Sequence, residues 1–479
     1  MNTSPAQLAS ALVSAAVRQM PGVVELGRQF ELAGFELALV GGSVRDIVLD
    51  RPVADLDFTT NATPDQIIAA LQPWADSVWD VGIAFGTVGA RRGALSAEIT
   101  TYRAEVYDSG SRKPEVAFGD SLEGDLLRRD FTINAMAVRL PSCEFVDLHD
   151  GAADLARRLI RTPREAEKSF TEDPLRMMRA ARFASQLGFT PVADVVIAAS
   201  NLVDRIDIVS AERVRDELSK LLLGSHPRAG LDFLEGTGLS QRVLPELPAL
   251  QLEIDEHHRH KDVYEHSLTV LEQAITLETT HEPASEPDLV LRLAALLHDI
   301  GKPRTRRFEV GGGVSFHHHE IVGAKMARKR LTALRYPGEV IEEVSTLIEL
   351  HLRFHGYGGG QWTDSAVRRY VRDAGDLLVR LHKLTRADCT TRNQRRAMQL
   401  AATYDDLEAR IAALREQEEL DAIRPDLTGG DIMRILGIGP GPDVGKAYRY
   451  LLELRLDRGP LNQGQAEALL TQWWSEQHD

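Results

Sequence analysis

The chain of 479 residues has little of what marks secreted, membrane-spanning or fibrous proteins. Its two cysteines, Cys143 and Cys389, lie far apart and have no metal-ligand spacing, which argues against a disulfide scaffold and suits a reducing compartment. No run of about 18 apolar residues is present, so we expect no membrane helix. Residues 1–20 lack a basic start and a long apolar core, and they predict a helix and not a signal peptide. These absences together predict a cytoplasmic protein.

The chain also lacks an excess of positive charge, since 56 Lys and Arg stand against 71 Asp and Glu, for a net charge of -15. This balance argues against an indiscriminate nucleic-acid binder but is compatible with RNA binding by a local basic face. Residues 157–182 carry such a cluster, for which a solvated helix face is the ordinary interpretation. Hydrophobic residues at 43% and charged residues at 27% are typical of a folded globular chain.

Hydrophobic periodicity predicts an α+β fold, with an N-terminal part of mixed helices and strands and a remainder that is helical. Residues 1–35 predict helices, residues 35–49 a strand, a glycine turn and a helix, and residues 54–60 a short strand. Residues 108–125 show no periodicity and predict a loop. We expect four regions, with the bounds 1–155, 156–250, 251–395 and 396–479.

A glycine turn follows the first predicted strand and opens a helix. Gly41 and Gly42 allow the backbone to approach a phosphate closely, and the free N–H groups of a helix start favour an anion. Ser43 and Arg45 add side-chain donors at the same place. A Gly-Gly pair alone is more often a tight turn, so its interpretation depends on the residues that follow.

Two aspartates follow this turn in the sequence. Asp55 and Asp57 are two residues apart in a predicted strand, which places both carboxylates on one face. Adjacent carboxylates repel each other unless a cation neutralises them, and paired Mg²⁺ ions are the usual machinery of phosphoryl transfer. An Asp-x-Asp sequence alone is common in turns, but next to a glycine turn it favours a phosphoryl-transfer site.

Five segments in order resemble the bacterial family of tRNA nucleotidyltransferases and poly(A) polymerases. The segment LVGGSVRDIVLDRPVADLDFTT resembles its opening motif, and the other four matches lie within residues 128–135, 147–155, 172–176 and 210–217. The resemblance covers about residues 30–250 and implies a polymerase-beta-like head followed by a helical neck. It also implies that the loop predicted at 108–125 helps to switch addition from C to A.

The resemblance assigns roles that suit the chemistry of these residues. It implies that Asp55 and Asp57 are catalytic and hold Mg²⁺. Glu98 and Glu105 are candidates for a third metal carboxylate, although outward strand positions explain them equally well. The residues implied to bind triphosphate, ribose and phosphate are Gly41, Gly42, Ser43, Arg45, Arg129, Asp130 and Asn134.

A third cluster predicts how the protein selects its nucleotides. Asp173, Arg176 and Arg179 are spaced by three after Thr171, and Pro174 favours a helix start, so we expect them on one helical face. A carboxylate only accepts hydrogen bonds, whereas a guanidinium only donates them. Asp173 therefore suits the amine of cytosine or adenine and Arg176 suits the adjacent ring nitrogen, while uracil and guanine present the reverse order. An ordinary intrahelical ion pair is the alternative, and the family resemblance implies selection of CTP and ATP without a template.

Residues 251–395 carry histidines and aspartates that are good ligands for divalent transition metals. In their order they resemble the HD phosphohydrolase superfamily, which implies a core metal site and an extended set for a second ion. Lys302 follows the His298-Asp299 pair and is a candidate to stabilise a bound phosphate. The core residues are His266, His298, Asp299 and Asp388, and the extended ones are His319 and His351. The histidines interpreted as ordinary surface residues are His257, His258, His260, His317 and His318.

We therefore expect an enzyme that adds CCA to the 3′ end of tRNA from CTP and ATP, with Mg²⁺ in the head and a transition metal in the HD region. The glycine-rich segments 429–433 and 439–446 resemble the family's tail and predict a tRNA contact, with a simple interhelical turn as the alternative. No protein partner follows from the sequence. The alternatives are a poly(A) polymerase, an enzyme that adds only CC or only A, and an HD phosphohydrolase whose head binds RNA.

Overall fold

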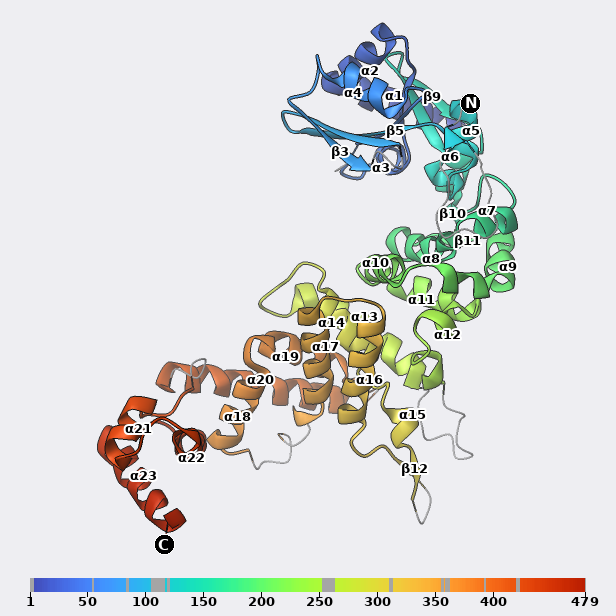
Figure 1. The fold of residues 1–479 in the computed structure, drawn as a ribbon. Helices are drawn as coiled ribbons and strands as arrows, with labels where there is room; N and C mark the ends of the chain where they lie inside the picture. The colour runs from blue at the N-terminus through green and yellow to red at the C-terminus, as the bar shows by residue number, and fades with distance from the viewer. Residues whose placement is uncertain are drawn as a thin grey trace. The chain divides into compact units, whose positions relative to one another are not determined.

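The structure is a computed structural model, and its described residues form two compact units, Met1–Pro245 and Glu246–Asp479. Figure 1 shows the first unit as a sheet with helices followed by helices alone, and the second as helices throughout most of its length. The predicted α+β class, with a mixed head and a helical remainder, is confirmed. The described residues are 4–53, 56–82, 86–104, 117–118, 121–251, 263–309, 313–354, 357, 362–391, 393–418 and 423–478.

The head is built on a mixed sheet whose described strands have the order β3-β4-β5-β2-β1-β8-β9. Strand β1 pairs antiparallel with β2 and β8, and β2 pairs parallel with β5. This register places Asp57 beside Glu98 and Thr59 beside Thr100. The strands are β1 (Leu37–Val40), β2 (Leu56–Thr60), β3 (Ser77–Gly82), β4 (Thr87–Arg92), β5 (Leu95–Thr101), β8 (Met136–Leu140) and β9 (Glu144–Asp147).

Both faces of the central strand β1 are covered, and all four of its residues are buried. Its residues Ala38 and Val40 pack in one apolar cluster with Leu122 and Leu126 of α5. Because side chains alternate along a strand, the other two residues of β1 face the opposite layer, where α2 packs on β1 and β8. The predicted loop over 108–125 is wrong at its end, because α5 begins at Leu122; residues 105–116 and 119–120 lie outside the described residues.

Helices occupy the rest of the first unit, and α8 packs against both α10 and α11. A two-stranded sheet of β10 (Leu159–Ile160) and β11 (Thr190–Pro191) joins the segments on either side of α8. A second short pair consists of β6 (Arg103–Ala104) and β7 (Ala117–Phe118). The helices are α1 (Pro5–Arg18), α2 (Pro21–Leu32), α3 (Gly42–Val48), α4 (Pro64–Leu71), α5 (Leu122–Leu127), α6 (Gly151–Arg157), α7 (Ala166–Glu172), α8 (Leu175–Leu187), α9 (Ala193–Asn201), α10 (Ala211–Leu222), α11 (Pro227–Gly236) and α12 (Leu239–Val243).

The second unit is a helical bundle with one short hairpin, β12 (Arg307–Phe308) and β13 (Val314–Ser315). Helices α13, α14, α17 and α19 pack on one another, and α16 packs along α17. A smaller apolar core joins α21, α22 and α23. No helix of the described part is long and apolar enough to cross a membrane. The helices are α13 (Val263–Thr280), α14 (Leu289–Leu297), α15 (Lys302–Thr305), α16 (His319–Ala333), α17 (Gly338–Leu350), α18 (Asp364–Ala374), α19 (Leu378–Ala387), α20 (Gln394–Glu418), α21 (Gly429–Leu436), α22 (Pro442–Arg458) and α23 (Gln463–His478).

Candidate active site and metal centre

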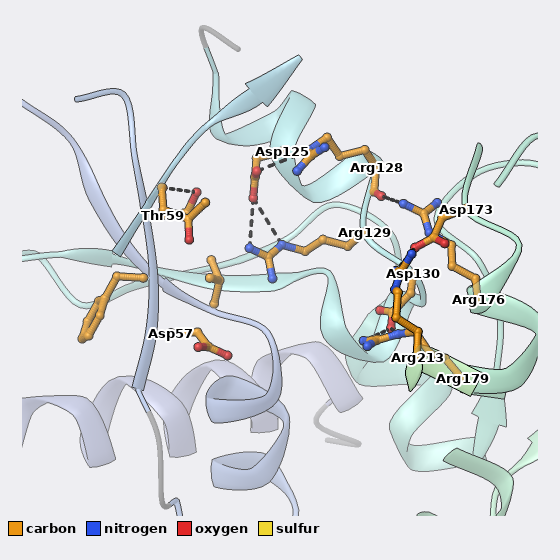
Figure 2. A pocket seen from close by; sticks show the side chains of 13 residues that line it. Asp57, Thr59, Asp125, Arg128, Arg129, Asp130, Asp173, Arg176, Arg179 and Arg213 are labelled. Atoms are coloured by element: carbon orange, nitrogen blue, oxygen red, sulfur yellow. Dashed lines mark hydrogen bonds and ion pairs between the residues drawn. The ribbon is translucent and has the colours of Figure 1, made fainter. Parts of the chain in front are cut away.

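A pocket of about 310 Å³ lies in the first unit and is rich in charged side chains from the sheet, α5, α8 and α10. Figure 2 shows these side chains gathered around one space, with Asp57 from the sheet on one side and the α8 residues on the other. Five arginines and four aspartates line it. They are Arg128, Arg129, Arg176, Arg179, Arg213, Asp57, Asp125, Asp130 and Asp173.

The glycine turn and Asp57 form one wall of this site. Gly41 has φ 73°, a conformation that favours glycine, and a Cβ there would lie 3.0 Å from Nη1 of Arg129 and 3.8 Å from Oδ2 of Asp57. The buried hydroxyl of Ser43 accepts a hydrogen bond from the backbone N–H of Asp57 at 3.3 Å. The turn is therefore joined directly to the strand that carries Asp57, and a side chain at Gly41 would enter the space between them.

The guanidinium of Arg45, predicted to bind triphosphate, already has protein partners in this structure. Its guanidinium donates to both carboxylate oxygens of Asp46, at 2.9 and 2.8 Å, and to Oδ1 of Asn134 at 2.7 Å. It also stacks over the ring of Phe183, 5.4 Å from the centroid. Arg45 therefore joins α3 to Asn134 and α8 in this structure, and its predicted contact with triphosphate stays a prediction.

Asp130 is the buried centre of a hydrogen-bond network. One oxygen accepts from the backbone of Phe131 at 2.8 Å and from the amide of Asn134 at 3.0 Å. The other accepts two bonds from Arg179 of α8, one of them at 2.7 Å from Nε. Burial alone would raise the pKa of Asp130, but Arg179 and these donors outweigh it and hold the pKa well below its usual range. Asp130 is therefore an anion that locks α8 to the head.

Arg179 continues this network into α10. Its Nη1 lies 3.8 Å from Glu217, which also pairs with Arg182 at 3.2 Å. Glu217 and Arg182 are both buried. Burial, and then the charge of Arg179, lower the pKa of Arg182 to about 10. Because Arg182 stays charged at neutral pH, Glu217 is the carboxylate that compensates it.

The predicted nucleotide-selecting residues line the same pocket, but the helical face assigned to them is wrong in one respect. Helix α7 ends at Glu172 and α8 begins only at Leu175, so Asp173 lies between two helices in an extended conformation. Its Oδ1 accepts from the backbone of Leu175 at 3.2 Å, and its Oδ2 lies 3.3 Å from Arg213. Pro174 does stand at the start of α8, as predicted, but Thr171 and Glu172 belong to the preceding helix α7 and not to that start.

Arg176 is held in place by partners other than Asp173. Its guanidinium donates to Oγ of Ser169 at 2.7 Å and to the backbone carbonyl of Arg128 at 2.5 Å. Burial lowers the pKa of Arg176, with Asp130 and Asp173 acting against that effect. The alternative interpretation, an ordinary intrahelical ion pair, is not what fixes Asp173 or Arg176, because each has its own partners.

Two residues of this pocket, Asp125 and Arg213, have no functional role predicted from the sequence. Asp125 of α5 is buried and pairs with Arg129 at 3.0 Å and Arg128 at 3.5 Å. The spacing of three and four residues between these charges was a readable helix signal. Arg213 lies within the matched segment 210–217. No spacing along the chain connects it to Asp173, which lies 40 residues earlier.

The three carboxylates predicted beside Asp57 differ in what the structure says of them. Glu98 is exposed and lies directly beside Asp57 in the β2–β5 register, so both project from the same face. Asp55 and Glu105 lie outside the described residues. Glu98 is therefore the candidate whose position fits a third carboxylate.

The six predicted metal ligands of the second unit come together as two groups of three. His266, His298 and Asp388 form the first group, and Asp299, His319 and His351 form the second, with the ligand atoms of each group within 4.8 Å of one another. Asp299 connects them, because its Oδ2 lies 3.2 Å from Nε2 of His298 and its Oδ1 lies 3.2 Å from Nε2 of His319. Three of the four core residues therefore form one group, and the fourth, Asp299, groups with the two extended residues.

Three of these histidines are oriented by the same local contact. The Nδ1 atoms of His298, His319 and His351 lie 2.9, 2.8 and 2.6 Å from backbone carbonyls three residues earlier. A carbonyl only accepts, so each Nδ1 carries a proton, and Nε2 is the ring atom left to face a metal. The buried Nε2 of His351 has no hydrogen-bond partner among the described residues. An unused buried lone pair is what a metal ligand requires, so these residues fit a divalent ion.

Charge around the cluster also suits metal binding. Burial, and then the charge of His298, lower the pKa of His351 to about 3, so its imidazole is neutral. Burial opposes ionisation of Asp299, but His298 and the neighbouring donors hold its pKa well below the usual range. The neutral imidazole of His351 and the ionised carboxylate of Asp299 are in the protonation states that bind a metal. Burial lowers the pKa of His298, but Asp299 and Asp388 outweigh it and raise that pKa, so a metal bound there displaces a proton.

A large cavity of about 1140 Å³ opens onto this centre. Lys302 lines it and donates to Asp299 at 2.6 Å. His317 and His318, which were interpreted as ordinary surface residues, are exposed and also line the cavity. Their place directly before His319 was the available signal. His257, His258 and His260 lie outside the described residues.

Three family models match successive parts of the chain. Residues 37–161 match the family described as "Poly A polymerase head domain", residues 188–250 match "Probable RNA and SrmB- binding site of polymerase A", and residues 263–414 match "HD domain". An A-adding tRNA nucleotidyltransferase of Deinococcus radiodurans is 35% identical over 448 residues, which cover 92% of this chain and 96% of that one. A CCA-adding enzyme of Lactobacillus delbrueckii is 44% identical over 214 residues, or 44% of this chain and 53% of that one. The chain therefore spans about half the length of that second relative.

Solved structures share the fold over the whole chain. The CCA-adding enzyme of Bacillus stearothermophilus in complex with CTP matches with a TM-score of 0.68 and 24% identity, covering 100% of this chain and 99% of that one. The Thermotoga maritima CCA-adding enzyme complexed with tRNA matches with a TM-score of 0.62 and 17% identity, covering 99% and 100%. The fold, the matched families and the full-length relative define a tRNA nucleotidyltransferase. The chain belongs to the class II family of CCA-adding enzymes and poly(A) polymerases, and it carries an HD domain.

Removal of the carboxylate that compensates Arg182 is expected to destabilise the first unit. Glu217→Ala leaves a buried guanidinium without its partner, which costs about 3–5 kcal/mol for a buried pair. Urea unfolding of the full chain checks this as a lower midpoint. Glu212→Ala, which removes an exposed glutamate from the same helix, is the control; equal midpoints for the two variants would contradict the role given to Glu217.

Proposed function

We propose that this chain adds the complete CCA sequence to the 3′ end of tRNA, using CTP and ATP. In each step the terminal 3′-hydroxyl attacks the α-phosphorus of the nucleotide, the bond to the β-phosphate oxygen breaks, and pyrophosphate leaves. The observation that carries the proposal is the placement of Asp173 and Arg176 in the pocket that also holds Asp57. Chemistry and base selection then share one site.

The carboxylate side of the pocket is proposed to bind Mg²⁺. Asp57, together with Asp55 and with Glu98 beside it in the register, supplies the oxygen ligands that Mg²⁺ prefers. When bound, Mg²⁺ lowers the pKa of the attacking hydroxyl and neutralises charge on the leaving pyrophosphate. Gly41 keeps the space beside Asp57 free, and Ser43 fixes the strand that carries it.

The arginine side of the pocket is proposed to hold the nucleotide. Arg129 lies 3.0 Å from the position of a Cβ at Gly41, so its guanidinium borders the phosphate turn. Asp130 is ionised and can accept a hydrogen bond from a ribose hydroxyl, and the neighbouring Asn134 offers an amide for the ribose or phosphate. Because Asp125 and Asp130 already orient Arg129 and Arg179, these groups are held before a nucleotide arrives.

Base selection is proposed to follow from fixed hydrogen-bond polarity. Asp173 can only accept and Arg176 can only donate, an order that fits cytosine and adenine. Ser169 and the carbonyl of Arg128 hold Arg176, and Arg213 and the α8 backbone hold Asp173. Neither side chain can turn to suit uracil or guanine without breaking these contacts, so the order is preserved.

Addition of the final A alone is the second candidate, and a specific observation favours it. The relative that aligns over 92% of this chain is an A-adding enzyme, whereas the Lactobacillus CCA-adding enzyme aligns over 44% of it. Asp173 and Arg176 suit adenine as well as cytosine, so they do not separate the two. Incubation with tRNAs that end before CCA, after C and after CC, and with unstructured RNA, followed by sequencing of the products, does separate them.

We further propose that the HD centre binds a divalent transition metal and hydrolyses a phosphomonoester or a 2′,3′-cyclic phosphate. Imidazole-rich ligands favour such ions, in contrast to the carboxylates of the head. A bound ion supplies an activated water and a charge that stabilises the phosphate oxygens. Lys302 adds a cation at the cavity wall, and the cavity admits a ligand as large as a nucleotide. Such an activity suits tRNA ends that are blocked by phosphate.

Loss of the head carboxylate is expected to abolish nucleotide addition. Asp57→Asn removes a metal ligand but keeps the size of the side chain, and losing about 4 kcal/mol of charge stabilisation corresponds to a rate roughly a thousandfold lower. Single-turnover incorporation of CTP and ATP measures it, and Asp65→Asn on α4 is the control. Incorporation near the wild-type rate with saturating Mg²⁺ would contradict the assignment.

Changing the acceptor that faces the base is expected to relax nucleotide choice. Asp173→Asn keeps an oxygen that can cap α8 but adds a donor, so discrimination against UTP should fall about tenfold while binding of the triphosphate changes less. The ratio of kcat/KM for CTP, ATP and UTP is the measurement. Asp216→Asn, an exposed neighbour on α10, is the control, and an unchanged ratio would assign base selection to other residues.

The metal centre is expected to be separable from nucleotide addition. His298→Ala combined with Asp299→Ala removes one ligand from each group of three, so bound transition metal and phosphatase activity should be lost. CTP and ATP incorporation should persist, since the head uses its own carboxylates. Metal content by mass spectrometry and hydrolysis of a nucleoside 3′-phosphate check this. A wild-type protein that binds no transition metal under any loading would refute the proposed centre.

A further inference from the structure

We propose that the β12–β13 hairpin and the residues at its base form a binding arm for single-stranded RNA beside the HD cavity. The arm is defined by residues 302–308 and 314–318. The two strands are short, with Arg307 opposite Ser315 and Phe308 opposite Val314. In Figure 1 the hairpin leaves the helices of the second unit after α15. Apart from Lys302, which the proposed hydrolase also uses, the arm has no role in nucleotide addition or in the metal cluster.

The arm begins and ends at the wall of the HD cavity. Lys302 at its start and Phe316, His317 and His318 at its end all line that cavity. Nζ of Lys302 lies 5.7 Å from the ring centroid of Phe316, so the two ends of the arm also meet each other. A ligand that lies along the hairpin is therefore led directly to the metal cluster.

An exposed aromatic ring and arginines follow on the arm. Phe308 is 72% exposed, more than Trp79 at 40% and Tyr448 at 39%, the other exposed Trp and Tyr side chains of the described residues. The guanidinium of Arg306 stacks over its ring at 4.8 Å. Arg306 therefore contacts the ring of Phe308, and the exposed remainder of the ring is available for a flat ligand.

The arginines of the arm have free charge. Arg304, Arg306 and Arg307 make no ion pair with any residue in the described ranges, although acidic residues outnumber basic ones in the chain. Three uncompensated cations beside an exposed ring match a polyanion that carries flat bases. Phosphates bind the arginines, and a base stacks on Phe308.

Single-stranded RNA fits these features better than other polyanions. Duplex RNA hides its base faces, so it cannot use Phe308, and an acidic peptide lacks stacking bases. The family of this chain acts on tRNA, whose 3′ end is single-stranded. That the strand ends in the HD cavity rests on the hydrolase proposed above, whereas RNA binding by the arm does not.

The test uses the full-length protein and a six-nucleotide single-stranded RNA that carries 4-thiouridine and a 3′-phosphate. Ultraviolet cross-linking and peptide mapping should place a cross-link within residues 302–318. Phe308→Ala should weaken this cross-linking in titrations about five- to a hundredfold, and Phe308→Tyr should restore it. Arg306→Ala with Arg307→Ala should lower the slope of log affinity against log salt by about 1.4.

A matched charge control separates the arm from general electrostatics. Lys325→Ala with Lys329→Ala removes two exposed cations from α16 of the same unit and should leave the cross-link unchanged. An equal loss in this control, no cross-link within 302–318, or equal competition by duplex RNA or poly-glutamate would each overturn the inference.

Hydrolysis distinguishes failure of the arm from failure of the metal centre. With Phe308→Ala, KM for the 3′-phosphorylated hexamer should rise while kcat and the hydrolysis of a nucleoside 3′-phosphate stay unchanged. If hydrolysis occurs with an unchanged KM for the hexamer, the arm is refuted and the hydrolase stands. If no hydrolysis occurs but the cross-link to the arm persists in wild type, RNA binding stands and the hydrolase is refuted.

Discussion

The bond between Asp130 and Arg179 is the interaction on which the first unit depends. Asp130 follows α5 in the head, and Arg179 belongs to α8 in the helical region, so this pair joins the sheet to the nucleotide-selecting segment. It extends to Arg45 through Asn134 on one side and to Glu217 on the other. Because these groups are largely buried and hydrogen-bonded, they hold the two walls of the pocket at a fixed separation. Under the proposed function, a base selected at one wall is then presented to the carboxylate of the other.

Local patterns in the sequence predicted most of the head, because they depend on residues close together in the chain. The strand, glycine turn and helix around Gly41 and the strand carrying Asp57 lie where periodicity placed them. The break at Asp173 was missed, since Pro174 suits a helix start and gives no sign that another helix ends just before it. The contact of Asp173 with Arg213 was also unpredictable, because it arises only when α8 packs on α10.

For the metal cluster, the sequence predicted which residues take part but not how they divide into two groups of three. The order of histidines and aspartates identified all six residues that meet there. Their division into two groups depends on which helix ends face each other: His298 follows α14, His351 follows α17, and Asp388 follows α19. Adjacent residues such as His298 and Asp299 therefore belong to different groups, and Asp299 connects them. Sequence adjacency carries no information on this point, because neighbouring side chains at a helix end project in different directions.

Charge explains how the head pocket of an acidic chain would bind a nucleoside triphosphate, as proposed above. The described lining of the head pocket has five guanidinium groups against four carboxylates, so it carries little net charge despite its arginines. Much of each arginine's hydrogen-bonding capacity is already used by Asp125, Asp130 or a backbone carbonyl, which favours orientation over bulk attraction. A triphosphate brings several negative charges that this lining cannot balance alone, and divalent cations at Asp57 are the natural complement. Under the proposed function, binding depends on the metal and on a matching base together, so neither the net charge of the chain nor any one arginine would determine which polyanion is accepted.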